Sequence, residues 1–222
     1  MAPSKKKKVV SARRRFFTIL IVAAIVVFLL GTFVVQIYRI PSGSMEDTLL
    51  VGDWVVVNKL VYQFKNPRPG DIIVFKYPLN PSKTLIKRCL AIEGQTIEIV
   101  DKVVYVDGKI IGDPEKVKFT DKYIRPAIYS TRDNYGPEQV PMDGLFVLGD
   151  NRDNSEDSRN FRCVDKDKVK GKVGFIIFSW TPDPKAPKFR SPYITPLIEI
   201  FFYNLFHFPN RVRWNRILSK VK

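Results

Sequence analysis

The chain has 222 residues, with 37 Lys and Arg against 22 Asp and Glu, and a formal net charge of +15 at pH 7. That length suits one sizeable globular domain and a short additional segment. Residues 1–15 carry a net +7 and residues 185–222 another +7, which leaves +1 for residues 16–184. A nucleic-acid-binding domain needs a basic patch on its folded face. The near-neutral body therefore argues against nucleic acid as a partner, and the two basic ends favour a membrane surface.

The few cysteines and histidines limit the cofactor chemistry. The chain has two cysteines, Cys89 and Cys163, and one histidine, His207. This is too few for a disulfide-rich framework, and no Cys-x-x-Cys or His cluster offers a metal site. We expect neither a metal nor another cofactor. Two free thiols are favoured over a single Cys89–Cys163 disulfide, which stays open for a domain outside the cytoplasm.

Residues 16–38 form an uncharged, apolar run of 23 residues. As a helix this run is about 35 Å long, enough to cross a hydrocarbon core of roughly 30 Å. The basic residues before it place residues 1–15 in the cytoplasm and residues 39–222 outside, with a single membrane pass. The alternative is a cleaved signal peptide. A retained anchor is favoured because the run exceeds an h-region of about 7–15 residues, and the bulky residues 36–39 offer no small-x-small cleavage site.

The body, residues 39–192, shows strand patterns rather than helical ones. No helical pattern of about 10–15 residues separates the apolar runs, which predicts a mainly β fold with an antiparallel sheet. Asp107-Gly108 indicates a hairpin turn that leads to Ile110-Ile111. Residues 112–141 are richer in charge and Pro, and we expect them to form a small inserted lobe. The predicted strands are Val55–Val57, Ile72–Phe75, Leu85–Ile92, Thr96–Val100, Val103–Val106, Leu145–Leu148 and Val173–Trp180.

The last segment, residues 193–222, is apolar and then basic. Its apolar part, Tyr193–Phe208, has only 16 residues and contains Glu199, so it is too short and too charged to span a bilayer. Its apolar residues recur near helical spacing, and arginines follow. We expect a helix here, and two positions for it stay open: at the membrane interface or packed on the core.

Three short clusters carry the chemistry: Ser42-Gly43-Ser44-Met45, Ile86-Lys87-Arg88-Cys89, and the polar run Gly149–Arg159. A serine is inert at neutral pH unless a base takes its proton, and His207 lies in an apolar stretch near the C-terminus. A lysine buried in an apolar strand is held neutral by desolvation, so Lys87 can serve as that base. Taken singly, each cluster also fits a structural role, as a linker, a strand-edge lysine or a solvated loop.

With the three clusters in this order, the sequence resembles the bacterial type I signal peptidases over residues 38–180. The resemblance includes Arg68-Pro69-Gly70-Asp71 and, near the end, Arg213-Trp214-Asn215-Arg216. It implies a largely antiparallel β body and a membrane-anchored serine endopeptidase that removes signal peptides from exported precursors after Ala-x-Ala sites. The implied setting is the bacterial plasma membrane, with precursor proteins and membrane lipid as partners of a monomeric chain.

The same resemblance implies roles for individual residues. Ser44 is expected as the nucleophile and Lys87 as the general base. The Ser42 hydroxyl and the Ser44 backbone N–H are expected to donate to the oxyanion, and Ser155 to orient the lysine amine. The implied ion pairs involve Arg88, Asp150, Asp157 and Arg159, and the implied substrate pocket is lined by Ile40, Met45, Leu49 and Ile86. The chain departs from the family pattern at Asp47, where proline is usual.

Two other functions stay open at this point. One is a membrane-tethered β-domain that binds a partner without catalysis, although intact Ser44, Lys87 and Ser155 argue against a decayed enzyme. The other is a Ser/Lys peptidase with a narrow set of clients, which only the range of cleaved precursors separates from general signal processing.

Overall fold

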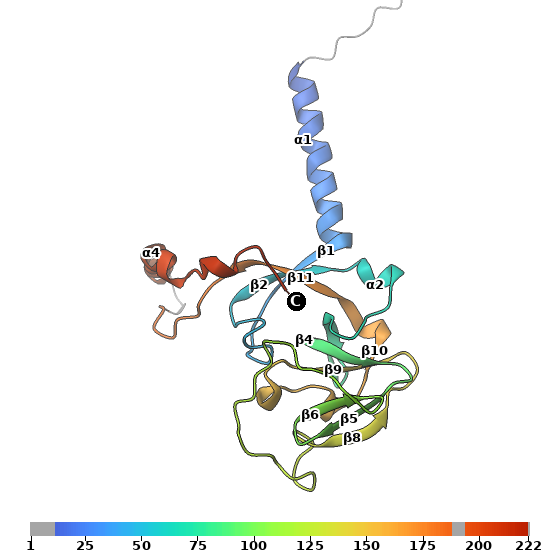
Figure 1. The fold of residues 1–222 in the computed structure, drawn as a ribbon. Helices are drawn as coiled ribbons and strands as arrows, with labels where there is room; N and C mark the ends of the chain where they lie inside the picture. Colours follow the sequence, from blue (N-terminus) through green and yellow to red (C-terminus); the bar gives the residue numbers. More distant parts are fainter. Residues whose placement is uncertain (1–11, 188–193, 222) are drawn as a thin grey trace, which may run out of the picture.

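The computed structural model describes residues 12–187 and 194–221, which form two antiparallel sheets below a long N-terminal helix (Figure 1). The larger sheet has the order β1-β2-β11-β3-β4-β9-β10, with β12 paired to β11, and the smaller has the order β7-β6-β5-β8. This confirms the mainly β, antiparallel fold class and the single N-terminal apolar helix. The strands of the larger sheet are β1 (Val35–Arg39), β2 (Asp53–Asn58), β3 (Ile72–Tyr77), β4 (Asn80–Ile92), β9 (Gly144–Leu148), β10 (Val164–Asp165), β11 (Val169–Ser179) and β12 (Ser219–Lys220).

The remaining elements are short or lie at the ends of the chain. The smaller sheet consists of β5 (Thr96–Val100), β6 (Val103–Val106), β7 (Lys109–Ile110) and β8 (Tyr135–Gln139). The helices are α1 (Ala12–Leu29), α2 (Val61–Phe64), α3 (Ser158–Phe161) and α4 (Ile194–Arg211), with a π-helical turn at Leu30–Val34 and 3₁₀ turns at Arg152–Asn154, Lys166–Lys168 and Trp214–Arg216.

Burial explains why the central strands form. The residues of β9 are all buried, and so are Ile72–Phe75 of β3, as expected for apolar runs covered on both faces. In β5 the buried residues alternate with half-buried or exposed ones, the pattern of a strand with one covered face. One core cluster joins the two sheets: Leu90, Ala91, Phe146 and Leu148 of the larger sheet contact Ile97, Ile99, Val104 and Val106 of the smaller.

The N-terminal apolar run is divided between a helix and a strand. The described chain holds one helix long and apolar enough to cross a membrane, Arg13–Val34, with 22 residues and a mean hydropathy of 2.9. At about 1.5 Å per residue it spans about 33 Å. Our expectation of a helix through Tyr38 is corrected, because Val35–Arg39 form β1, paired with β2 from Val35↔Asn58 to Arg39↔Trp54. The β-branched Val35 and Ile37 favour the strand once β2 offers it a partner.

The inserted lobe is larger than the sequence indicated. Because β4 pairs with β9 at Ile92↔Leu145, the intervening residues 93–143 form one insertion that contains the whole smaller sheet. The expected lobe, residues 112–141, therefore starts too late. It is also not all loop, since Tyr135–Gln139 form β8 and pair with β5. Figure 1 places this lobe at the end of the body farthest from α1.

The C-terminal segment leaves the body and returns to it. An isolated bridge joins Trp180 to Val212, so residues 181–211 form a loop with a closed base, and β12 then pairs with β11. The predicted helix is present as α4, although Tyr193 lies outside the described residues. Of the two positions left open for it, core packing is not the one found, because most apolar side chains described on α4 are exposed and none of them enters the three core clusters.

The two cysteines are free thiols. Cys89 is fully buried in the core cluster around Phe75 and Val147, whereas Cys163 packs against the cluster between the two sheets. The disulfide that the sequence left open is therefore absent, because the two side chains belong to different cores.

Candidate functional site

The strand register brings the second and third clusters together. Strand β4 pairs with β9 at Arg88↔Leu148. Because the strands are antiparallel, the next step along the ladder places Lys87 beside Gly149, where β9 ends and the polar run begins. Arg88 and Lys87 are adjacent on one strand, so their side chains point to opposite faces of the sheet.

The first cluster is fixed by the third. Strand β1 leads directly into the turn around Ser44, which is closed by hydrogen bonds from Glu46 N to Gly43 O (3.0 Å) and from Leu49 N to Met45 O (2.6 Å). Asn151 then binds the turn twice, donating its backbone N–H to Ser44 O (3.1 Å) and its side-chain amide to Gly43 O (3.1 Å). Ser44 is thus held by backbone contacts to the segment that follows Gly149.

Gly149 allows the close approach of the clusters. A Cβ at this position would lie 2.2 Å from Ser155 Oγ and 2.5 Å from Ser44 O, both far inside van der Waals contact. Only glycine lets the end of β9 pass between the serine turn and Ser155.

Lys87 is buried and held by one serine. Its side chain is only 2% exposed, and its Nζ donates a hydrogen bond to Ser155 Oγ at 2.9 Å. Desolvation by burial lowers the pKa of Lys87 to about 8, against the opposing attraction of Asp157. About one tenth of the amine is therefore neutral at pH 7, and about half at pH 8, and the neutral amine is the state that a base requires.

Arg88 and Asp150 form a buried two-point ion pair. Arg88 Nε donates to Asp150 Oδ1 at 2.8 Å and Arg88 Nη2 donates to Asp150 Oδ2 at 2.7 Å. Arg88 also donates to Gly70 O (3.0 Å), and Thr48 Oγ1 donates to Asp150 Oδ2 (2.6 Å). The pair ties the turn after Ser44, through Thr48, to β4 and to the segment after β9.

Asp157 and Arg159 form a second buried ion pair, next to the end of β9. Arg159 donates through Nε and Nη2 to the two oxygens of Asp157, each at 2.8 Å. Asp157 also accepts the N–H of Gly149 at 3.1 Å and caps α3, where it accepts the backbone N–H of Arg159. The carboxylate thus fixes the segment that carries Ser155 relative to the end of β9.

A small cleft of about 120 Å³ opens beside Ser44. Ser42, exposed on the turn, and the half-buried Ser44 both line it. Three of the four predicted pocket residues, Ile40, Met45 and Ile86, line it as well, together with Tyr38, Arg39, Pro41, Thr84 and Leu85. Leu49 is not among the lining residues, because it is fully buried in the core cluster with Val55 and Val57.

Sequence reasoning missed the part played by Asn151. Asn151 is only 3% exposed and holds the Ser44 turn, yet within the polar run it looked like any other loop residue. The single histidine lies elsewhere: it is exposed on α4, where its Nδ1 is 2.8 Å from Tyr203 O and its ring stacks on Tyr203.

Comparison with known proteins identifies the family. A sequence model described as "Signal peptidase, peptidase S26" matches residues 13–180, which include α1, all three clusters and both sheets except β12. The chain belongs to the signal peptidase family, peptidase S26. It is therefore a protease of the class that processes signal peptides, and an N-terminal apolar helix fits a membrane-anchored member.

Two relatives of known name agree with this assignment. The chain is 30% identical to a signal peptidase I of Aquifex aeolicus over 84% of this chain and 92% of the relative. It is 32% identical to a signal peptidase I of Pseudomonas aeruginosa over 72% of this chain and 70% of the relative. A crystal structure of a signal peptidase I from Enterococcus faecalis is 28% identical, with a TM-score of 0.41, and covers 49% of this chain and 97% of its own.

Proposed function

We propose that the protein cleaves signal peptides from exported precursors after small-x-small sites, with Ser44 as nucleophile and Lys87 as general base. Cleavage takes place at the extracytoplasmic surface of the plasma membrane. The observation that carries this proposal is the state of Lys87: a buried amine with a pKa of about 8, held by Ser155 at 2.9 Å beside the segment that binds the Ser44 turn.

The reaction follows from these positions. The neutral Lys87 amine takes the proton of Ser44 Oγ as that oxygen attacks the scissile carbonyl carbon, which gives a tetrahedral intermediate. The negative charge on the former carbonyl oxygen is met by the Ser44 backbone N–H and the Ser42 hydroxyl. The protonated lysine then gives its proton to the leaving amine, and the acyl-enzyme forms. A water, activated by the same amine, releases the signal peptide as a carboxylic acid and restores Ser44.

The cleft supports a preference for small side chains. The cleft has a volume of about 120 Å³, and its lining includes the apolar side chains of Ile40, Met45 and Ile86. Alanine-sized groups fit such shallow pockets, whereas larger apolar side chains must displace well-packed neighbours. Leu49 supports this lining by packing in the core and does not itself contact the substrate.

The membrane helix supports the location. Seven basic residues precede the apolar run, so the proposed orientation has a cytoplasmic N-terminus and an extracytoplasmic body in a bacterial plasma membrane. Ser44 follows Val34 by ten residues, which reach at most about 33 Å when fully extended. The cleavage site of a membrane-inserted signal peptide lies at the same depth, just beyond its own apolar segment.

The test is precursor cleavage by full-length protein purified in detergent, with product masses measured across a panel of precursors. One precursor carries Ala-x-Ala at the cleavage site. The others carry valine or phenylalanine in place of one of the two alanines. We expect cleavage only after small-x-small sites and none by Ser44→Ala, whereas the control Ser82→Ala, an exposed serine of β4, stays active. Equal cleavage by Ser44→Ala would overturn the proposed nucleophile, and cleavage of only one precursor would favour a narrow-client peptidase.

A further inference from the structure

Helix α4 has an apolar face that no described part of the chain covers. On a helical wheel at about 100° per residue, its apolar side chains fill one half of the circumference. They are strongly exposed, with Phe201 at 62% and Phe206 at 74%. The exposed apolar residues of this face are Leu197, Ile198, Phe201, Phe202, Leu205 and Phe206, whereas Phe208 packs against the rings of Trp180 and Trp214. This is more than the scattered apolar exposure of an ordinary soluble surface.

Most contacts of α4 with the body come from its opposite side. Tyr203 donates a hydrogen bond from its hydroxyl to Asp183, and Arg211 lies over the ring of Trp180 with 4.4 Å between Cζ and the ring centroid. Arg211 also donates to Asn204 at 3.0 Å. The polar side is therefore occupied by protein, while the apolar side faces away from these contacts.

The base of the α4 loop is fixed to the larger sheet. Trp180 bridges to Val212, and Arg213 donates to Val51 O (2.7 Å) and Ser179 Oγ (2.7 Å). Arg216 forms an ion pair with the fully buried Asp53 at 2.6 Å. These contacts hold α4 in a defined place, so its exposed face is a fixed feature of the fold.

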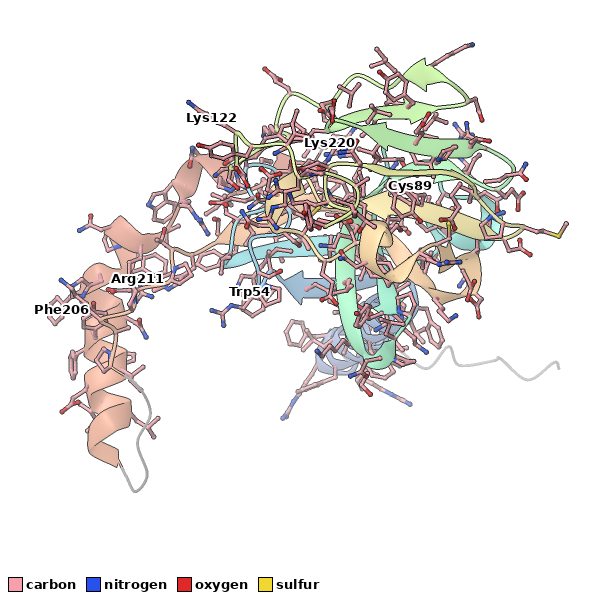
Figure 2. The ribbon with its side chains drawn as sticks, turned by 90° about the horizontal axis from the view of Figure 1, so that it is seen from below. Trp54, Cys89, Lys122, Phe206, Arg211 and Lys220 are labelled. Carbon is pink, nitrogen blue, oxygen red and sulfur yellow. The ribbon has the colours of Figure 1, made fainter. Side chains whose placement is uncertain are left out.

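The position of α4 points to a lipid surface as the occupant. Helix α1 runs lengthwise in Figure 1 and is seen nearly end-on in Figure 2, whereas α4 is end-on in Figure 1 and lengthwise in Figure 2, with Phe206 labelled on it. The two helices therefore lie crosswise. Figure 1 also places α4 at the level of β1, β2 and β11, the end of the body from which α1 rises. A membrane crossed by α1 would thus lie parallel to α4.

Charge supports the same occupant. Residues 185–222 contain eight Lys and Arg, and Glu199 is their only acid. Basic residues beside an apolar helical face suit the anionic headgroups of a bacterial membrane. An 18-residue helix is about 27 Å long, enough to lie in one leaflet as a second attachment point.

We propose that α4 is an interfacial helix whose apolar face enters the outer leaflet of an anionic phospholipid bilayer. Strand register places it at the other end of the β1–β2–β11 ribbon from α1, since β1 starts at Val35 opposite Asn58 and Lys172, and β11 leaves the sheet at Ser179 opposite Asp53. Two attachments at opposite ends of one ribbon set the tilt of the body, and with it the height of the Ser44 turn above the membrane.

The direct test attaches an environment-sensitive NBD fluorophore to either face of α4. Leu205→Cys labels the apolar face and His207→Cys the opposite, exposed polar face, each in full-length Cys163→Ser protein. Cys89 can stay, because it is fully buried and burial raises the pKa of its thiol to about 12. The protein is reconstituted in phosphatidylcholine–phosphatidylglycerol vesicles that contain acyl-chain spin-labelled lipid.

We expect the spin-labelled lipid to quench the probe at position 205 and to leave the probe at position 207 unquenched. An unquenched, water-like probe at both positions overturns the proposal. A probe at position 205 that is shielded from water but unquenched by lipid also overturns it, in favour of a second copy of the chain. Quenching at both positions contradicts an interfacial orientation, since it requires immersion of the whole helix.

A second experiment, which rests on the proposed function, measures the peptidase activity of a double variant, Phe201→Ser combined with Phe206→Ser. The matched control is Tyr123→Ser combined with Ile128→Ser, two residues of the inserted lobe that are 82% and 85% exposed. We expect the α4 variant to raise KM several-fold for a precursor embedded in vesicles and to leave kcat/KM for a short soluble peptide unchanged. The control should change neither, and an unchanged KM in vesicles for the α4 variant counts against the orienting role.

Discussion

Lys87, the proposed general base, also lowers the stability of the folded chain. A lysine that is 2% exposed and has its pKa lowered to about 8 from 10.5 is protonated in both the folded and the unfolded chain below pH 8. Below pH 8 the folded state therefore carries the full free-energy penalty of desolvating the charged amine. As pH rises from about 8 to 10.5, the unfolded chain binds more protons than the folded one, so stability increases with pH.

We expect the free energy of unfolding of Lys87→Met at pH 7 to exceed that of wild type by up to about 3 kcal/mol. The reason is that the variant no longer buries the charged amine whose desolvation lowers the pKa. The gain should shrink as pH rises and vanish above about pH 10.5. Urea unfolding at several pH values measures it. A gain that does not depend on pH would show that a charge on Lys87 is not the source of the cost.

Ser155→Ala should slow turnover less than loss of Ser44 or Lys87. Ser155 accepts the amine hydrogen bond at 2.9 Å and so orients the base without exchanging a proton with the substrate. Losing one such hydrogen bond costs about 1–2 kcal/mol, or about 5–30-fold in kcat. A full kinetic profile checks this, with KM expected to stay near the wild-type value. Complete loss of activity in a folded Ser155→Ala protein would assign Ser155 a direct chemical role.

Removing one partner of the Arg88–Asp150 pair should destabilise the fold. Asp150→Ala takes away the carboxylate that holds a 4%-exposed guanidinium at two points, and we expect a loss of about 3–5 kcal/mol in unfolding free energy. The control is Glu93→Ala, which removes the partner of Lys166 in a solvent-exposed pair and should leave the denaturation midpoint unchanged. Equal midpoints for the two variants would mean that the buried pair does not hold the site together.

At the scale of elements, the fit of β9 against the Ser44 turn is the most sensitive feature. Gly149→Ala places a methyl group 2.2 Å from Ser155 Oγ and 2.5 Å from Ser44 O, so both must move. We expect activity to fall by at least about 10²-fold, as small displacements of reacting groups do. Gly174→Ala on β11 is the control, since its new methyl group meets nothing closer than Val56 O at 3.7 Å. Normal activity of Gly149→Ala would refute the tight fit.

The elements that could be predicted are those with local signals. Alternating residues and an Asp-Gly turn predicted Thr96–Val100 and Val103–Val106 with the bounds that the structure has. Strand β8 was missed because its Gly136 and Pro137 are typical of loops, and its strand structure depends on pairing with β5 across the inserted lobe. Strand β1 was missed because its apolar residues continue the membrane run without a break.

The sequence indicated candidate site residues but not the contacts between them. A lysine inside an apolar strand and a serine in a small-residue turn are visible in the sequence, and the structure places Lys87 and Ser44 near the same end of β9. The clamp by Asn151 and the burial of Leu49 are not visible there, since both depend on how the turn after β1 packs across the sheet.

At the scale of the whole molecule, α1 and the Ser44 turn are close together along the chain. Helix α1 continues through a π turn into β1, and β1 continues into the Ser44 turn, so the anchor and the site are joined by a single paired strand. The inserted lobe lies at the far end of the body. The cleft beside Ser44 is thus lined by β1, the Ser44 turn and β4 of the larger sheet, and none of its described lining residues comes from the inserted lobe.

The proposed orientation predicts accessibility from one side only. Protease added to intact spheroplasts should digest residues 39–222, because the body lies outside, and should leave a small N-terminal fragment. An epitope tag placed before residue 1 should be cut only after lysis. Protection of the body until lysis would reverse the topology.

The central claim is that a neutral, buried Lys87 activates Ser44, and the pH dependence of kcat/KM tests it most directly. For wild type on a soluble Ala-x-Ala peptide, kcat/KM should rise about tenfold per pH unit at low pH and level off with a midpoint near pH 8, the pKa of the free-enzyme lysine. Lys87→Arg should be inactive at every pH, since its guanidinium stays protonated. A wild-type profile that is flat from pH 6 to pH 10, or a Lys87→Arg enzyme that cleaves, would contradict the account.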